Sequence, residues 1–261
     1  MRPAMSDRPK MEPQDEAAAR SAVYQTLSTA FFYPAGERIR PCPIAEIPDR
    51  LAIALDQLPY AVPAADSLVA DLRAALHGVD DAALCERYTA LFDNCKGRAA
   101  VSLYEKDYGN GDAKVIWEEV IRFYEHFGLD FDVRESRDWP DHLGTELEFM
   151  HYLTFIEASA PDGGSAYRKP QADFLTRHLA KWAPRFRTQL ERAGEDIPTA
   201  PYAFCAQLVD AFIGAEMDYL GCARETAQNW VPMHEARSGH SGQTIVPIVD
   251  LSGAAYDELP Y

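Results

Sequence analysis

The side chains of this sequence that could do chemistry gather around Asp141 and His142. An apolar, helix-forming segment begins there, and Glu146 and Glu148 follow within two turns. A helix would place His142 and Glu146 on one face, because four residues separate them. Asp141 would lie near the helix N-terminus, where the macrodipole favours a carboxylate that can cap free N–H groups. Two interpretations follow: a capping aspartate with solvated glutamates, or a functional site.

A metal site is the alternative that Glu148-x-x-His151 suggests, since this is the Glu-x-x-His spacing of di-iron carboxylate bundles. Those sites need the motif twice. No glutamate stands three positions before any of the other six histidines; those positions hold Ala74, Phe123, Trp139, Leu175, Val231 and Arg237. A helix-surface pair is therefore favoured, and a metal-dependent helical-bundle enzyme using Glu148, His151 and nearby carboxylates is kept as the alternative.

Other catalytic signatures are absent from the sequence. It contains no G-x-S-x-G elbow, P-loop, glycine-rich dinucleotide loop or H-E-x-x-H motif. The five cysteines, at positions 42, 85, 95, 205 and 222, form no C-x-x-C pair, and their odd number fits a reducing compartment better than a disulfide framework. We expect a protein that is not an enzyme and has no catalytic residues or metal ligands.

Aromatic and acidic residues alternate in two segments before this region. The first is Tyr88-Thr89-Ala90-Leu91-Phe92-Asp93, and the second runs from Val101 to Asn110. Rings beside carboxylates can line a groove that accepts an apolar peptide carrying basic residues. The alternative is that Leu91, Phe92 and Tyr104 belong to the core; as a set, these residues favour the groove.

The elements that must position these residues are helices. Apolar residues recur at spacings of three and four over about 19–31, 48–58, 64–77, 81–92, 113–127, 142–158, 166–182, 184–192 and 201–222. Asp80 suits the N-cap of the fourth segment, and Gly128 suits the end of the fifth. We predict an all-α fold: a single helical bundle of about eight to nine helices over residues 15–223, with extended or disordered tails at 1–14 and 224–261. The run 244–249 is strand-like, but Pro247 confines it to an edge or a tail.

The charge excludes several functions. With 41 acidic and 25 basic residues the formal net charge is −16, which repels phosphate backbones and anionic membrane surfaces. Neither a secretory signal nor an apolar run long enough to span a bilayer is present, so we expect a cytoplasmic protein. A composition with 47% hydrophobic residues supports a full core.

The sequence resembles the TorD/DmsD/NarJ family of chaperones for molybdenum enzymes of the dimethyl sulfoxide reductase superfamily. Three stretches carry the resemblance: Tyr88-x-x-Leu91-Phe92-Asp93, Ser102-Leu103-Tyr104-Glu105 and Pro140-Asp141-His142-Leu143-x-x-Glu146-Leu147-Glu148-Phe149-Met150. The segment with Phe174, His178, Leu179, Trp182 and Phe186 also looks like later helices of the family. The residues of these stretches look most similar to those of chaperones for the type II enzymes, such as dimethylsulfide, ethylbenzene, selenate and chlorate oxidoreductases.

The resemblance implies a system-specific chaperone without a permanently bound cofactor. Such a chaperone binds the N-terminal leader, often a twin-arginine signal, and the apo form of a catalytic subunit until its molybdopterin guanine dinucleotide is inserted, before export or assembly. The resemblance does not decide whether the chain is a monomer or a homodimer. Asp141 and His142 would lie where the leader docks. The apolar wall of the groove would come from Tyr88, Leu91, Phe92 and Tyr104, and its negative charge from Glu105, Asp107, Glu146 and Glu148.

Overall fold

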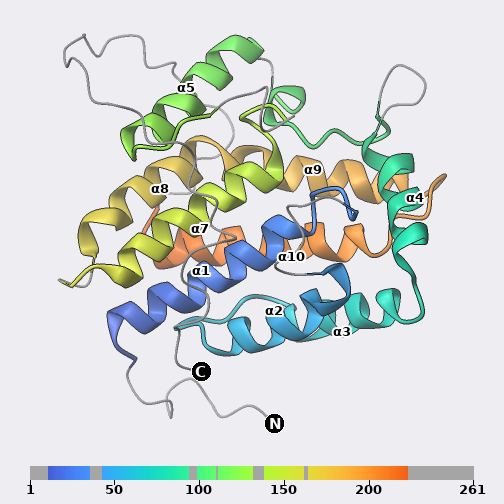
Figure 1. Cartoon of the computed structure of the whole chain (residues 1–261), viewed down its shortest axis with the longest axis horizontal. Coiled ribbons are helices and arrows are strands. Elements are labelled where there is room, and N and C mark those ends of the chain that lie inside the picture. Colours follow the sequence, from blue (N-terminus) through green and yellow to red (C-terminus); the bar gives the residue numbers. More distant parts are fainter. Residues whose placement is uncertain are drawn as a thin grey trace.

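The computed structural model describes residues 11–35, 43–93, 99–109, 111–131, 138–161 and 164–222. Nine α-helices lie in this part of the chain (Figure 1): α1 (Pro13–Thr29), α2 (Ile47–Asp56), α3 (Ala65–Leu76), α4 (Asp81–Phe92), α5 (Ala113–His126), α7 (Leu143–Ser159), α8 (Arg168–Arg177), α9 (Leu179–Ala193) and α10 (Tyr202–Tyr219). Short 3-10 turns are η3 (Ile44–Glu46), η4 (Glu105–Asp107) and η5 (Ser165–Tyr167). The described ranges contain no strand, so the all-α prediction is confirmed.

Helices α1 and α7 form the centre of the bundle and pack against each other along their lengths (Figure 1). One stripe of α7, with Leu143, Leu147, Met150 and Thr154, is fully buried. Phe149 and Leu153 are buried as well, so α7 is enclosed on most sides. A helix that is apolar around most of its circumference is stable only in such a central position.

Local sequence signals fix several helix ends. Asp80 caps α4 as predicted, since its carboxylate accepts a hydrogen bond from the Ala83 N–H at 2.8 Å. Gly128 follows α5 with φ of +75°, a conformation that favours glycine.

No helix in the described ranges is long and apolar enough to cross a membrane.

The division between the two helices after residue 165 differs from the prediction. The break lies at His178, between α8 and α9, and Pro184 is inside α9. The apolar face of α9, including Trp182 and Phe186, is buried on both sides of the proline and offsets the hydrogen bond that its missing N–H cannot make. The strand-like run 244–249 and most of both predicted tails lie outside the described residues.

Arg20 on α1 is the centre of a buried ionic network that joins four helices. Its guanidinium makes two bonds of 2.7 Å to Glu216 on α10, one of 2.9 Å to Glu157 on α7 and one of 2.5 Å to Gln171 on α8. All four side chains are fully buried. The two carboxylates also accept hydrogen bonds from Tyr24, Tyr60 and Arg168. Every charge in the network therefore has a partner, which is the condition for keeping ions in a core.

Candidate functional site at the Asp141-His142 junction

Two loops that are far apart in sequence pair directly in front of α7. The Glu105 N–H donates to the Asp141 carbonyl at 3.0 Å, and the Leu143 N–H donates to the Leu103 carbonyl at 2.8 Å. These bonds flank an isolated antiparallel bridge between Tyr104 and His142. Two of the three stretches that suggested the family are thereby joined into one structural unit.

Asp141 is fully buried and holds two further elements in place. One carboxylate oxygen accepts the Lys106 N–H at 3.0 Å, and the other accepts the Trp117 indole N–H at 2.7 Å. Burial raises the pKa of Asp141 to about 6, against the opposing effect of these two donors. Asp141 thus connects η4, α5 and α7, and of the two interpretations offered for it, the one as the helix cap was wrong.

His142 is the residue that caps α7. Its Nδ1 accepts a hydrogen bond from the Gly144 N–H at 3.1 Å, which places the ring proton of the neutral side chain on Nε2. The ring stacks on Phe32 with centroids 5.3 Å apart, and Tyr104 approaches it edge-on at the same distance. The imidazole is therefore fixed between two aromatic rings.

Gly144 makes this packing possible. A Cβ atom at this position would lie 2.6 Å from the Phe32 ring, which is closer than carbon atoms approach in proteins. Glycine has a lower helix propensity than most residues, but because it has no side chain, the Phe32 ring can stack on His142. The Asp-His-Leu-Gly sequence thus encodes both the cap and the space for its aromatic partner.

Glu146 lies one turn into α7, fully buried, beside a second buried carboxyl group. One of its oxygens accepts the Trp182 indole N–H at 3.1 Å. Glu105, its neighbour, binds Nδ1 of His178 at 2.8 Å. Burial raises the pKa of Glu146 well above its ordinary value, and the charge of Glu105 raises it further. The interpretation of a solvated glutamate was therefore wrong for Glu146.

The raised pKa of Glu146 leads to a prediction for the pH dependence of stability. The pKa of Glu146 in the folded protein is raised above 4.5, so its contribution to stability is complete below about pH 4.5 and is lost as the pH rises. Glutamine has nearly the same shape as glutamic acid and does not ionise. We expect Glu146→Gln to gain stability relative to the unsubstituted protein as the pH increases from about 5 to about 8, by up to about 1.4 kcal/mol per pH unit.

Urea unfolding across this pH range measures the effect. Glu86→Gln, which removes an exposed carboxyl group of α4, is the matched control and should give a difference that does not change with pH. A constant difference for Glu146→Gln as well would contradict the raised pKa of Glu146.

Three of the four residues predicted as the apolar wall, Tyr88, Leu91 and Phe92, are buried on α4. Leu91 is fully buried on α4, and Tyr88 and Phe92 are each 9% exposed and pack on Tyr202. They lie in the core, which is the alternative weighed for Leu91 and Phe92 in the sequence. They support Tyr33, which is 44% exposed and meets Tyr88 edge-on at 5.5 Å. Leu91 could contact a peptide directly only if this part of the core opened. The role of Leu91 in peptide binding therefore stays a prediction.

Of the remaining predicted site residues, three lie at the surface or near it. Tyr104 is half-buried, and its hydroxyl donates to Asp138 at 3.2 Å. Asp107 is exposed and pairs with Lys106 at 2.9 Å. Glu148 is half-buried and stands two residues after Glu146, so it points away from the Glu105 pair. The structure therefore brings Tyr104, Glu105, Asp141, His142 and Glu146 together, with Asp107 beside them and Glu148 on another face of α7.

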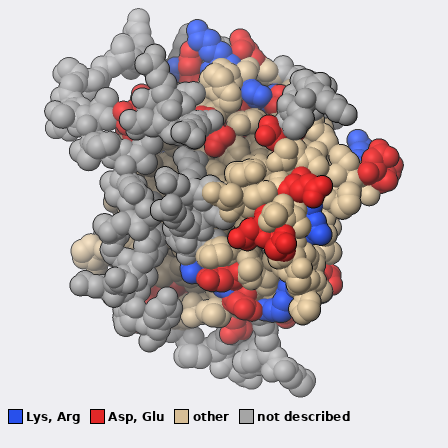
Figure 2. All heavy atoms as spheres, turned by 45° about the vertical axis from the view of Figure 1, so that its right-hand side comes forward, with Lys and Arg blue, Asp and Glu red and all other residues tan. Residues whose placement is uncertain are grey.

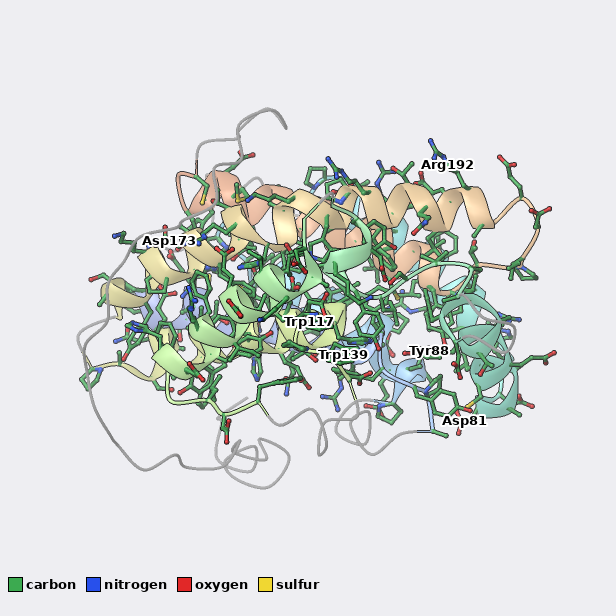
Figure 3. The ribbon with its side chains drawn as sticks, turned by 90° about the horizontal axis from the view of Figure 1, so that it is seen from above. Asp81, Tyr88, Trp117, Trp139, Asp173 and Arg192 are labelled. Carbon is green, nitrogen blue, oxygen red and sulfur yellow. The ribbon has the colours of Figure 1, made fainter. Side chains whose placement is uncertain are left out.

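Two tryptophans of the site were missed in the sequence. Trp117 on α5 stacks on Trp139 with centroids 4.2 Å apart and planes within 3° (Figure 3). Trp139 directly precedes Pro140-Asp141, and that position was a signal in the sequence. Trp117 lies 24 residues before Asp141, and no local pattern marks it as a partner.

The metal alternative finds no support in the geometry. His151 is buried, its Nδ1 lies 2.8 Å from Oγ and 3.1 Å from the carbonyl oxygen of Ser21, and burial lowers its pKa to about 4. Among the residues that the structure describes, no three His, Cys, Asp or Glu side chains are placed to hold a metal ion.

Comparison of the sequence with models of known protein families shows the family to which the chain belongs. A family model described as the nitrate reductase delta subunit matches residues 47–188, which include both paired loops and the Glu105–Glu146–His178 cluster. The chain belongs to this family, which includes TorD and NarJ, and the resemblance seen in the sequence is confirmed.

Among individual proteins, the chain is similar to several assembly chaperones. The chain is 44% identical over 111 residues to the selenate reductase assembly chaperone protein of Thauera selenatis, covering 40% of this chain and 55% of that protein. It is 41% identical over 108 residues to the chlorate reductase assembly chaperone protein of Ideonella dechloratans, with the same coverage. The chain thus spans about half the length of these two relatives. The dimethyl sulfide dehydrogenase assembly chaperone protein of Rhodovulum sulfidophilum is 32% identical over 198 residues, 69% of this chain and 74% of that protein. No solved structure matches.

Proposed function

We propose that this chain is a cytoplasmic assembly chaperone, not an enzyme, for the catalytic subunit of a molybdoenzyme of the dimethyl sulfoxide reductase family. The observation that carries the proposal is the similarity to the Rhodovulum assembly chaperone over two thirds of the chain. The selenate and chlorate reductase chaperones support the same class of client.

In this proposal the chaperone binds the N-terminal leader of its client, including a twin-arginine signal, near Asp141 and His142. It holds the apo subunit until molybdopterin guanine dinucleotide is inserted, and has no resident cofactor of its own. Acidic side chains gather across the middle of the face in Figure 2, which brings the α4 side of Figure 1 forward. Together with the net charge of −16, they favour the approach of a basic leader.

Leader binding can be measured directly. The purified chain would be titrated by calorimetry with synthetic leader peptides from the catalytic subunits of selenate reductase, chlorate reductase and dimethyl sulfide dehydrogenase. We expect saturable binding of at least one peptide, weaker at higher salt because of the opposite charges. Light scattering in the same buffer distinguishes a monomer from a homodimer.

Client maturation needs a separate experiment. Each catalytic subunit would be produced with and without this chain, and its molybdenum content measured per subunit. Higher molybdenum occupancy with the chaperone is the expected result. Equal occupancy for all three clients, together with no binding of any leader, would overturn the proposed function.

A further inference from the structure

The bond between Glu105 and His178 ties η4 to the break between α8 and α9. The Glu105 carboxylate lies 2.8 Å from Nδ1 of His178, and the two residues are 8% and 1% exposed. The His178 ring packs on Phe174 with centroids 4.9 Å apart and meets Phe123 edge-on at 5.6 Å, so its position is fixed. Since η4 also pairs with the loop before α7, this bond attaches the paired loops to α8 and α9.

A second buried carboxyl group stands beside this bond with few hydrogen-bond donors around it. Glu146 is fully buried on α7, and its Oε2 accepts the Trp182 indole N–H at 3.1 Å. Its Oε1, like Nε2 of His178, is buried without a hydrogen-bond partner among the residues that the structure describes. One donor does not satisfy a buried carboxylate, so the neutral acid is the favoured form of Glu146.

The other titratable groups next to the two glutamates are acidic or neutral. Asp141 is fully buried before α7, and its charge adds to the negative charge of Glu105 in opposing the ionisation of Glu146. On α5, the Tyr124 hydroxyl donates to a backbone carbonyl at 2.9 Å. Burial, and then the charge of Glu146, raise the pKa of Tyr124, so this phenol stays neutral.

The cations of the neighbouring elements have other partners. Lys106 of η4 pairs with Asp107, and Arg177 at the end of α8 pairs with Glu119. Arg185 of α9 donates to a backbone carbonyl just after η4. In the part of the chain that the structure describes, no lysine or arginine bonds to either buried glutamate.

We propose that Glu105, Glu146 and His178 form a proton-dependent latch, which holds η4 on the α8–α9 break while Glu146 is protonated and releases it when that proton is lost. Loss of the proton places two like charges side by side in the core. Of the two glutamates, Glu105 is the one with access to water, because Glu146 is 0% exposed. Glu105 therefore turns outwards to relieve the repulsion, and this movement breaks its bond to His178.

The direction of the pH effect follows from the proton on Glu146. Its pKa is raised in the closed latch and returns toward the ordinary value when the latch opens and water enters. The closed form is therefore most favourable below about pH 4.5 and is lost as the pH rises toward the raised pKa. Each pH unit in this interval increases the ratio of open to closed latch by up to about tenfold.

Hydrogen exchange of backbone amides in the full-length chain measures the opening. The N–H groups of Glu105 and Lys106 donate to Asp141 and report on the attachment of η4. We expect their protection factors, corrected for intrinsic exchange rates, to fall about 10-fold or more from about pH 6 to about pH 8. The N–H of Leu153, in the middle of α7, should stay at least about 10-fold better protected, because the opening is local.

Substitutions assign the effect to the latch. In Glu146→Gln the protection of the η4 amides should not change with pH, since glutamine does not ionise. In His178→Leu the bond is missing, and the same amides should be poorly protected already at about pH 6. Glu86→Gln removes an exposed carboxyl group of α4 and should behave like the unsubstituted protein.

Two results would overturn the latch. One is protection of the η4 amides that does not depend on pH in the unsubstituted protein, or that matches the protection of Leu153 at every pH. The other is a pH dependence that persists unchanged in Glu146→Gln, and this comparison remains decisive if His178→Leu fails to fold. The measurement uses no client peptide, so either result leaves the proposed function standing.

Discussion

Replacing Arg20 by methionine is expected to lower the free energy of unfolding by about 3–5 kcal/mol, the cost of breaking a buried ion pair from one side. Methionine has a similar length and no charge. Glu216 and Glu157 would stay fully buried without the guanidinium that now binds both. Urea unfolding near pH 7 measures the change.

An exposed arginine provides the matched control. Arg50 pairs with Glu46 one turn away at 3.1 Å, but both side chains are about half exposed, 44% and 54%. Arg50→Met should change stability by less than about 1 kcal/mol, since exposed pairs contribute little. If both substitutions gave the same small change, the network around Arg20 would make no more contribution to stability than an exposed ion pair. A further substitution, Glu216→Gln in the Arg20→Met protein, should recover part of the loss by removing one of the unpaired charges.

Asp141→Ala is expected to have the second largest effect, a loss of about 2–4 kcal/mol. The carboxylate accepts two hydrogen bonds, from the Lys106 N–H and the Trp117 indole. Alanine leaves both donors without an acceptor in a buried site, at roughly 1–3 kcal/mol each. The measurement is urea unfolding at about pH 5, below the pKa of about 6 that burial gives Asp141, because a carboxyl group with a raised pKa contributes most to stability at low pH.

Asp107→Ala tests whether any carboxylate of this loop has the same effect. Asp107 is exposed, and we expect little change in stability on its removal. Equal losses for the two variants would contradict the connecting role of Asp141. The comparison also bears on peptide binding: Asp141→Ala should weaken leader binding, because Asp141 holds the loop before α7, where the leader is proposed to dock, against η4 and α5.

The sequence predicted those features that depend on near neighbours. Helix α4 begins and ends at the predicted residues 81 and 92, because Asp80 caps it and the apolar stripe runs to Phe92. The helix over about 142–158 was also predicted from its apolar periodicity, and it forms as α7, Leu143–Ser159. Asp141 and His142 were recognised as the centre of the site because their types and position at a helix start are visible locally.

The missed features depend on contacts between distant segments. His142, not Asp141, became the cap because the Asp141 carboxylate is taken by donors 35 and 24 residues away. The break at His178 lies where its ring meets Glu105, 73 residues earlier. Arg20 looked like an ordinary polar position of an amphipathic helix, since nothing in the neighbouring residues indicates Glu216 as its partner. Such pairings follow from the packing of helices, which periodicity alone does not specify.

The Arg20 network also has a consequence for synthesis on the ribosome. Arg20 and Glu216 are 196 residues apart, so α1 leaves the ribosome long before its main counter-ion exists. At about 5–20 residues per second the delay is about 10–40 s. During that time α1 has an arginine on a face that the finished bundle buries, and the central α1–α7 packing cannot reach its final form. Folding of the core is therefore expected to be completed after α10 emerges, late in translation.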